Sequence, residues 1–323
     1  MCQNCKALAD AIDRYIAKAD NSLEALIQSE GYYDSKVTME YINAIEEGVA
    51  EALTAETQSF VIEAEKAVNL RAFAGKHWDK IKENDGLAVS LYRIFKQQLQ
   101  SFMPHFVEGY IKLVEGELRL QGVSKRTIAW VESWSKELSN IMQLTSHNEI
   151  EGILKKGLEN NYDIPRFIRE IQQSGIREEY YRARRVAVTE VLRAHSVAHQ
   201  EAIMQSPSVD TKTWRHSGPK KIVPRDNHVE IDGQTVPKGS PFTLWGADGI
   251  VYYPMYPRDT ILPPSESVSC HCISQANASE EALGLSLEER RRLQQEAIEE
   301  MDAEWERELN ERNKAKAGIE EIP

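Results

Sequence analysis

Two cysteines one residue apart, Cys270 and Cys272, are the residues best suited to chemistry in this 323-residue chain. On an extended strand their side chains point to one side, with the Cα atoms about 7 Å apart. This spacing suits two thiolate ligands of one metal ion better than a direct disulfide, which would be strained. A tetrahedral zinc needs two more ligands, and the sequence offers His228, with His216 or Asp226 as the fourth. We therefore predict a structural zinc site; the alternative is a pair of reduced thiols.

Two other pairs have weaker metal-binding patterns. Cys2 and Cys5, at the N-terminus, could supply the missing zinc ligands. His195 and His199 lie four residues apart on one helical face, a spacing that can bind a metal, but the glutamate of a metalloprotease helix is absent between them. Polar packing or exposure to solvent is the favoured interpretation of this histidine pair.

No pattern in the sequence points to catalysis. The chain contains no nucleophile elbow, phosphate loop or dinucleotide fingerprint. A cysteine nucleophile at Cys270 or Cys272 with His228 as its base is conceivable, but a catalytic thiol needs only one cysteine. We therefore predict no catalytic residue and a protein that is not an enzyme.

The elements that must position these residues are mostly helices. Apolar residues recur with the helical period of 3.6 in five stretches before residue 161, at about 7–27, 37–67, 86–121, 124–143 and 147–160. Pro104 is expected to end or kink one of these helices. Asp163 has the pattern of a helix cap with Pro165 in the first turn, and a long helix is predicted from Arg177 to about residue 203.

The composition changes at about Gln205. Nine of the twelve prolines lie between Pro207 and Pro264. Asp232-Gly233 is a hairpin signal within this part of the chain. Short strands are predicted at 211–214, 228–231, 234–236, 242–244 and 250–253.

The C-terminal segment returns to a helical pattern. Ser286 and Glu289 form a capping box at its start. Apolar side chains then recur every four residues on a highly charged helix, at Leu293, Ala297, Met301, Trp305 and Leu309, with Ile298 beside them. A stripe this narrow cannot stabilise a helix alone, so we expect it to pack on the body of this protein or on another subunit.

The fold class expected from these patterns is mainly α with a small α+β module. Long amphipathic helices fill 1–149, a short-stranded, loop-rich β region follows within 150–275, and an acidic helical tail covers 276–323. No run of about 18 apolar residues indicates a transmembrane helix, and the first residues lack the pattern of a secretion signal. We therefore expect a protein made and used inside a cell, without a membrane partner.

Charge is distributed unevenly. The net charge of -12 argues against wholesale nucleic-acid binding. Between Arg177 and Arg225, however, ten Lys and Arg stand against five Asp and Glu, whereas from Ala276 onward seven stand against fourteen. The basic stretch could contact DNA locally; the alternative is two ordinary solvated faces.

An ordered set of short motifs lies within 150–275: Ala187-Val188-Thr189-Glu190, Lys212-Thr213-Trp214, Arg225-Asp226-Asn227-His228, Asp232-Gly233 and Ser269-Cys270-His271-Cys272. In this order and spacing the motifs resemble the phage Mu F-type head-morphogenesis (minor head, minor capsid) family. Val188, Ser269 and His271 depart from the family pattern, which has Arg, Asn and Arg there. The family pattern suggests that Glu190 pairs with Arg225 and ties the long helix to the β region. Trp214 is expected to anchor the core.

The resemblance implies a minor head protein of a tailed phage or prophage, present in the virion capsid interior and, during assembly, in the host cytoplasm. Its partners would be the portal protein and the major capsid or scaffold protein, and its role procapsid assembly, DNA packaging or DNA delivery. Two alternatives remain open: a metal-dependent enzyme or toxin-associated phage protein, and a DNA-binding module that contacts packaged DNA through Arg177–Arg225.

Overall fold

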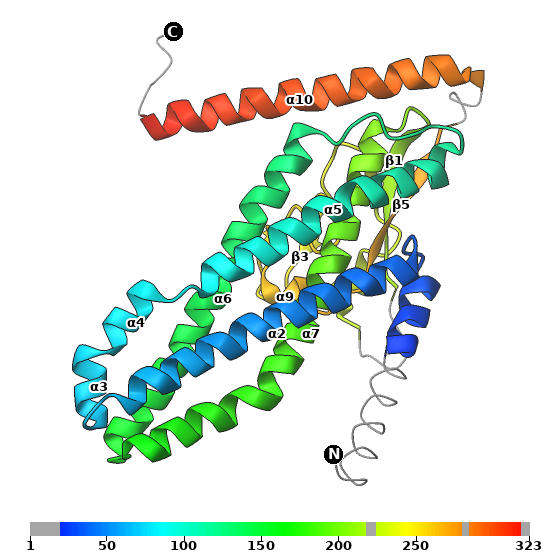
Figure 1. Cartoon of the computed structure of the whole chain (residues 1–323). Coiled ribbons are helices and arrows are strands. Elements are labelled where there is room, and N and C mark those ends of the chain that lie inside the picture. The colour runs from blue at the N-terminus through cyan, green and yellow to red at the C-terminus, as the bar shows by residue number, and fades with distance from the viewer. Residues whose placement is uncertain (1–19, 218–223, 280–283, 318–323) are drawn as a thin grey trace. The chain divides into compact units, whose positions relative to one another are not determined.

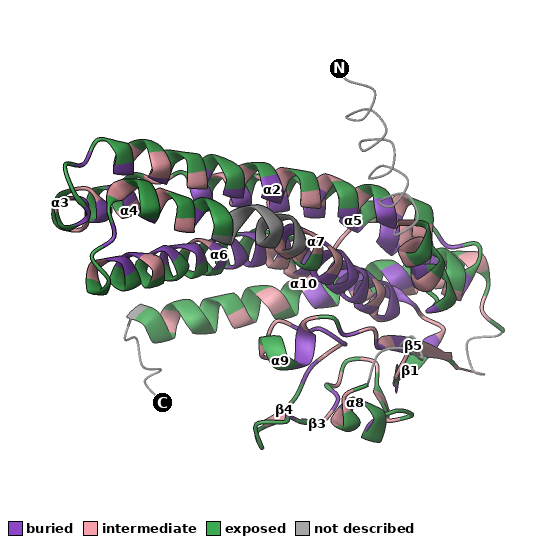
Figure 2. Cartoon of the chain, turned by 90° about the horizontal axis from the view of Figure 1, so that it is seen from below, coloured by how far each residue is buried: buried purple, intermediate pink, exposed green. Residues whose placement is uncertain are grey.

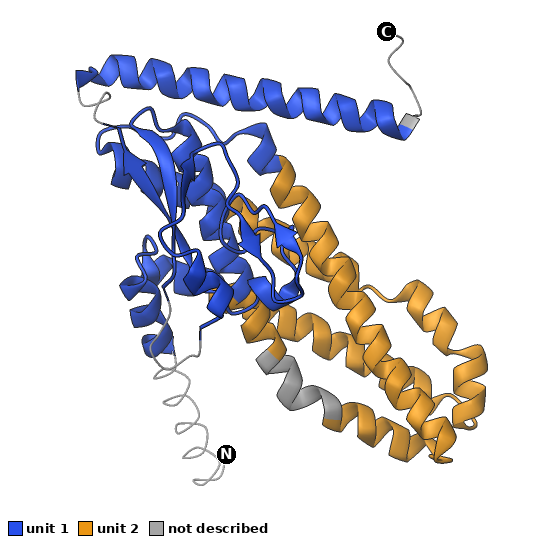
Figure 3. Ribbon diagram, turned by 180° about the vertical axis from the view of Figure 1, so that it is seen from behind, with its two compact units in different colours: residues 1–41, 102–128, 189–323 blue, residues 42–101, 129–188 orange. Residues whose placement is uncertain are grey.

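The structure, a computed structural model, describes residues 20–217, 224–279 and 284–317, without the side chains of 174–181 and 317. Cys2, Cys5 and the first part of the predicted helix at 7–27 lie outside the described residues. By compactness the chain forms two units (Figure 3). Unit 1 comprises 1–41, 102–128 and 189–323, and unit 2 comprises 42–101 and 129–188. The division into three segments drawn from the sequence stays a prediction.

The predicted fold class is confirmed, because helices dominate and the strands are few and short (Figure 1). The helices are a segment at 20–29, α2 (Ser35–Glu65), α3 (Leu70–Lys76), α4 (Trp78–Asn84), α5 (Leu87–Glu115), α6 (Lys125–Glu159), α7 (Ile164–Gln205), α8 (Asp226–Glu230), α9 (Pro264–Ser267) and α10 (Leu287–Ala317). The strands are β1 (Val209–Arg215), β2 (Thr235–Pro237), β3 (Leu244–Trp245), β4 (Val251–Tyr252) and β5 (Ile273–Ala278). None of the described helices is long and apolar enough to cross a membrane.

The predicted break between 124–143 and 147–160 is wrong, and so is the alternative that Pro104 ends a helix; a kink at Pro104 stays a prediction. The stretches at 124–143 and 147–160 form one helix, α6, because the residues between them include no Pro or Gly that would interrupt a helix. Pro104 lies inside α5 and does not end it. Pro104 and Gln100, whose carbonyl lost its hydrogen-bond partner to the proline, are both exposed, so water can satisfy that carbonyl. The buried side chains Phe102 and Phe106 hold the helix on either side of the proline.

Two predicted helix starts are confirmed. Asp163 Oδ1 accepts a hydrogen bond from the backbone N–H of Arg166 at 2.8 Å, which caps α7. Ser286 and Glu289 form the capping box of α10: the Ser286 N–H donates to Glu289 Oε2 at 2.8 Å, and the Glu289 N–H donates to Ser286 Oγ at 3.2 Å.

Unit 2 is helical and has its own aromatic core. Its buried side chains come mainly from α2, α3, α4, α6 and α7 and include Phe60, Phe73, Trp78, Ile150, Leu154, Tyr162 and Phe167. The long helices carry buried residues along one side and exposed residues along the other (Figure 2), as the 3.6-residue period requires.

Unit 1 contains all the described strands. β1 is the centre of an antiparallel three-stranded sheet in the order β2-β1-β5, and β3 pairs with β4 separately. The predicted strand at 228–231 is wrong, since these residues belong to α8 and the turn after it. Gly233 supplies the left-handed turn (φ 85°) that leads from Asp232 into β2, where Thr235 pairs with Thr213 of β1.

The apolar stripe of α10 packs on other parts of unit 1. Ile298 and Met301 are buried, whereas Leu309 is exposed, so the predicted stripe is covered only in its first half. Polar contacts complete the attachment: the Lys125 N–H donates to Asp302 Oδ1 at 2.7 Å, and an Arg126 N–H donates to Glu308 Oε1 at 2.7 Å. Most of the surface of α10 is exposed (Figure 2).

Candidate metal centre

Three of the predicted metal ligands meet in unit 1. His228 lies in the middle of α8, and Cys270 and Cys272 lie between α9 and β5. Arg225, the residue before α8, donates hydrogen bonds of 2.6 Å to the carbonyls of Ser265 and Val268, which ties α8 to the chain around α9. This link holds the histidine beside the cysteines. We call the group His228, Cys270 and Cys272 the thiol–imidazole cluster.

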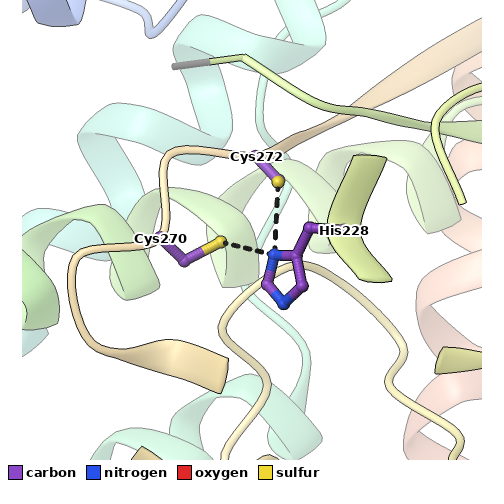
Figure 4. A group of neighbouring side chains, drawn as sticks. All are labelled: His228, Cys270 and Cys272. Carbon is purple, nitrogen blue, oxygen red and sulfur yellow. Dashed lines mark hydrogen bonds between the residues drawn. The ribbon is translucent and has the colours of Figure 1, made fainter. Parts of the chain in front are cut away.

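The geometry of the thiol–imidazole cluster centres on one ring nitrogen. Figure 4 shows both sulfur atoms directed at His228 Nδ1, which lies 3.6 Å from Cys270 Sγ and 3.5 Å from Cys272 Sγ. The candidate ligand atoms all lie within 4.8 Å of one another, and all three residues are buried. His216 approaches from the end of β1, with its Nδ1 3.6 Å from Cys272 Sγ. The residue types and distances fit a divalent metal ion with sulfur and nitrogen ligands.

Glu266 orients the histidine of the cluster and was not found from the sequence. Its Oε2 lies 3.0 Å from His228 Nε2 and accepts a hydrogen bond from Asn227 Nδ2 at 3.1 Å, while its Oε1 accepts one from the Ala247 N–H at 2.9 Å. Burial raises the pKa of Glu266, but these hydrogen bonds outweigh that effect and leave the pKa below its ordinary value. Glu266 is therefore a carboxylate, and His228 Nε2 carries the proton that it accepts.

Arg258 places a buried positive charge beside the cluster. Its guanidinium donates to the Cys270 carbonyl and to Ser196 Oγ, both at 2.7 Å, and it lies 5.6 Å from the ring centre of Tyr32. These contacts hold the start of the cysteine loop against α7. Arg258 has a left-handed backbone (φ 65°), which costs energy for a non-glycine residue and so requires support from its surroundings. The Arg193 side chain gives that support by donating to the Arg258 carbonyl at 2.7 Å.

The two thiols titrate as a pair. The hydrogen bond between them lowers the pKa of Cys270 and raises the pKa of Cys272. The positive charge of Arg258 favours the thiolate form of both residues. For Cys272 the hydrogen bond and burial outweigh this effect, so its pKa is raised. Cys270 is therefore the more easily ionised of the two thiols.

His271, between the two cysteines, has a different contact. Its Nδ1 lies 2.9 Å from Glu30 Oε2, at the end of the helical segment 20–29. Both side chains are largely buried. The loop that carries the cysteines is therefore also fixed to the N-terminal part of unit 1.

Three other predicted site residues, Trp214, Asp232 and Asp226, lie in different surroundings. Trp214 is fully buried among Phe242, Leu244 and the two cysteines, so its prediction as a core anchor is confirmed. Asp232 Oδ1 accepts a hydrogen bond from the His216 N–H at 3.0 Å, which places this turn next to the cluster. Asp226 is exposed at the first residue of α8 and is not part of the cluster, whereas His216 Nδ1 lies 3.6 Å from Cys272 Sγ, so His216 is the better candidate for a fourth ligand.

The predicted pair of Glu190 with Arg225 is wrong. Glu190 Oε2 lies 3.0 Å from Arg193 Nε, one turn further along α7, and both side chains are buried. Arg225 instead binds the two backbone carbonyls next to α9. One tie between α7 and the β region therefore runs from Glu190 through Arg193 to the Arg258 carbonyl.

The histidine pair of α7 is part of a buried polar network, as the packing interpretation expected. The Nε2 of His195 lies 2.9 Å from Thr38 Oγ1 and its Nδ1 lies 2.9 Å from the Tyr110 hydroxyl. The ring of His199 stacks on Tyr110 at 4.5 Å. Each ring nitrogen of His195 is thus hydrogen-bonded to a hydroxyl group.

We expect the protein to lose stability on acidification because of these two histidines. Burial, reinforced by the nearby charge of Arg258, holds the pKa of His195 well below 6.5, and burial lowers the pKa of His199 to about 4. Below pH 6.5 the unfolded chain therefore binds more protons than the folded chain, and the free energy of unfolding falls, by up to about 1.4 kcal/mol per pH unit for each site.

Urea unfolding at pH 7.5, 6.5 and 5.5 measures this slope. His195→Gln is expected to reduce the slope relative to the wild type, whatever it costs at neutral pH. An identical slope in both proteins would contradict the assignment.

The basic stretch from Arg177 to Arg225 does not form one exposed patch in the part of the chain that the structure describes. Arg193 and Lys212 are buried, and Lys212 Nζ donates to Gln200 Oε1 at 3.0 Å and to the Met255 carbonyl at 2.7 Å. Arg184 pairs with Glu46 at 2.5 Å within unit 2. Internal contacts thus account for part of the positive charge that suggested DNA binding, which stays a prediction.

Fold and site together define a mainly helical protein whose small β region carries a buried thiol–imidazole cluster. Residues 132–275 match the family described as "Phage Mu protein F like protein". Over 313 residues the chain is 30% identical to the uncharacterized protein YqbB of Bacillus subtilis (strain 168), covering 91% of this chain and 98% of that protein. No solved structure matches the chain. The chain therefore belongs to the phage Mu protein F like family.

This membership confirms the resemblance seen in the sequence at 150–275. The family is a structural one, concerned with phage head morphogenesis, and is not known as enzymatic. A phage head protein associated with the virion capsid is accordingly the class that the comparisons support.

Proposed function

We propose that this chain is a minor head protein of a tailed phage or prophage that acts inside the head by binding other head components. The match of 132–275 to the phage Mu protein F like family carries this proposal. The partners that we propose are the portal protein first and the major capsid or scaffold protein second. Its role would lie in procapsid assembly, DNA packaging or DNA delivery.

Burial of the thiol–imidazole cluster supports a binding role rather than a chemical one. The exposed fractions are 2% for His228, 2% for Cys270 and 1% for Cys272. A substrate could reach these atoms only if the surrounding core opened. A catalytic metal site needs an accessible open position, whereas a structural one is closed.

The outer face of α10 is the surface that we propose for partner binding. Glu288, Glu296 and Glu299 are exposed there, while the opposite side of the helix packs on other parts of unit 1. Carboxylates on a rigid helix favour a partner surface that carries Lys and Arg, through faster and more selective association.

Co-purification with the portal protein tests this function. Immobilised portal protein is expected to retain the wild-type chain, and to retain the triple variant Glu288→Gln, Glu296→Gln, Glu299→Gln less well. These substitutions leave untouched the residues that attach α10 to unit 1.

A matched control carries three neutralised exposed carboxylates on α2, namely Glu47→Gln, Glu51→Gln and Glu65→Gln. It is expected to bind portal as well as the wild type does. Failure of portal, major capsid and scaffold proteins alike to retain the wild type would contradict the proposed function. Equal retention of both triple variants would contradict only the role of α10.

A further inference from the structure

We propose that unit 1 binds one structural zinc ion through His228 Nδ1, Cys270 Sγ and Cys272 Sγ, with His216 Nδ1 as the fourth ligand. The proposal rests on the distances and hydrogen bonds around the thiol–imidazole cluster. It does not depend on which head component the protein binds.

The separations between ligand atoms match those of a tetrahedral zinc site. Zinc–sulfur bonds of about 2.3 Å and zinc–nitrogen bonds of about 2.0 Å at tetrahedral angles place sulfur and nitrogen about 3.5 Å apart. The three sulfur–nitrogen distances are 3.6 Å (Cys270 to His228), 3.5 Å (Cys272 to His228) and 3.6 Å (Cys272 to His216). Cys270 Sγ, Cys272 Sγ and His228 Nδ1 are thus already spaced for one ion, whereas His216 Nδ1 is near Cys272 only, and its side chain must move closer to the other two ligands to complete the site.

Both sulfur atoms converge on the same ring nitrogen of His228, as they would around a shared metal ion. His228 Nε2 faces the carboxylate of Glu266 at 3.0 Å and needs its proton there. In the neutral ring, Nδ1 then offers a single lone pair, yet two sulfur atoms approach it within 3.6 Å. One lone pair accepts one S–H, whereas a metal ion between the three atoms satisfies all of them.

Glu266 completes the pattern of a metal-binding histidine. Such histidines donate their second ring N–H to a carboxylate or carbonyl, which fixes the ring and increases its basicity. Glu266 is 1% exposed, and it is held by the Ala247 N–H and by Asn227 as well as by the histidine. We assign Glu266 as a positioning residue that acts through His228.

His216 is the best fourth ligand among the described residues. Its ring nitrogen lies near Cys272, and its backbone N–H is held by Asp232 Oδ1 at 3.0 Å. It is partly exposed, so it is the ligand through which an ion would enter from solvent. Two thiolates and two imidazoles form a closed set that favours zinc and leaves no open position for a substrate.

The ion would join parts of the chain that are far apart in sequence. His228 and Cys270 are separated by 42 residues, and β1, α8 and the loop before β5 have only a small shared core around Trp214. A metal that closes such a loop contributes directly to the stability of the folded state. The site therefore acts as a structural centre for the β region.

Metal analysis of the full-length protein without a purification tag tests the proposal, because a histidine tag binds metals itself. We expect about one zinc ion per chain, with other transition metals at trace level. Replacement by Co²⁺ is expected to give sulfur-to-cobalt charge-transfer absorption together with the visible bands of a tetrahedral site.

Substitutions distinguish the proposed zinc ligands from nearby residues that do not bind the ion. Cys270→Ser and Cys272→Ser are expected to lose the zinc, and Glu266→Ala to weaken zinc binding about 10- to 100-fold. His271→Gln is the matched control for the loop, since His271 contacts Glu30 instead of the cluster. The double variant Cys2→Ser, Cys5→Ser is the control for the remaining thiols. Both controls are expected to keep the zinc.

If the ligand variants fail to fold, the zinc content and the cobalt spectrum of the wild type still test the proposal. Absence of zinc from a folded wild type that also gives no cobalt charge-transfer band overturns the proposal. Loss of zinc in the Cys2→Ser, Cys5→Ser variant, or an unchanged tetrahedral cobalt spectrum in His216→Ala, overturns the assignment of His216 as the fourth ligand.

Discussion

Replacing Trp214 by alanine is expected to lower the free energy of unfolding of unit 1 by about 3–5 kcal/mol. The indole is fully buried and packs edge-on against Phe242, with ring centres 5.3 Å apart, and against His228, with ring centres 5.7 Å apart. The substitution removes the apolar contacts and leaves a cavity next to the cysteines. Because this core is small, its neighbours have little other packing with which to fill the space.

Trp245→Ala is the matched control, since this tryptophan is 62% exposed on β3. It is expected to change the free energy of unfolding by no more than about 0.5 kcal/mol. Urea unfolding followed by circular dichroism measures both variants. Equal stability of the two variants would contradict the placement of Trp214 in the core.

Glu190→Ala is expected to cost about 3–5 kcal/mol as well, because it leaves the Arg193 guanidinium buried without its carboxylate. The two side chains are each 5% exposed and 3.0 Å apart. Arg193 also donates to the Arg258 carbonyl, and Arg258 in turn binds the Cys270 carbonyl. Losing the carboxylate therefore weakens the support of the loop that carries the cysteines.

Two comparisons test this assignment by urea unfolding. Glu296→Ala breaks an exposed pair with Arg292 on α10 and is expected to cost less than about 1 kcal/mol. The double variant Glu190→Ala, Arg193→Met is expected to be less destabilised than the sum of its single variants, because the second substitution removes the buried positive charge that Glu190 balances. Wild-type stability of Glu190→Ala would contradict the buried pair.

The helices could be predicted from the sequence because their information is local. The period of apolar residues revealed α2 and α5, and α6 as two shorter stretches, while side-chain chemistry revealed the caps at Asp163 and Ser286. Pro104 misled the prediction, because the effect of a proline depends on whether its side of the helix faces water. The apolar pairs on either side, Phe102-Met103 and Phe106-Val107, place Pro104 on the polar side of the helix.

The β region was harder to predict. The prediction of a strand at 228–231 relied on a Gly turn after it, but these residues form α8, held by bonds from Arg225 to carbonyls about 40 residues away. The thiol–imidazole cluster was found because cysteine and histidine are rare and chemically distinctive. Glu266 and Arg258 were missed because Glu and Arg are common, and only the folded chain shows that these two are buried.

The family assignment and the structure support one central claim, that the protein is a component of the phage head. Mass spectrometry of gradient-purified procapsids and mature heads, from a host induced to produce the phage, tests this claim most directly. Peptides of this chain are expected to co-sediment with the portal protein in procapsids, in far fewer copies than the major capsid protein. Their absence from procapsids and from mature heads, with the protein present in the lysate, would contradict the claim.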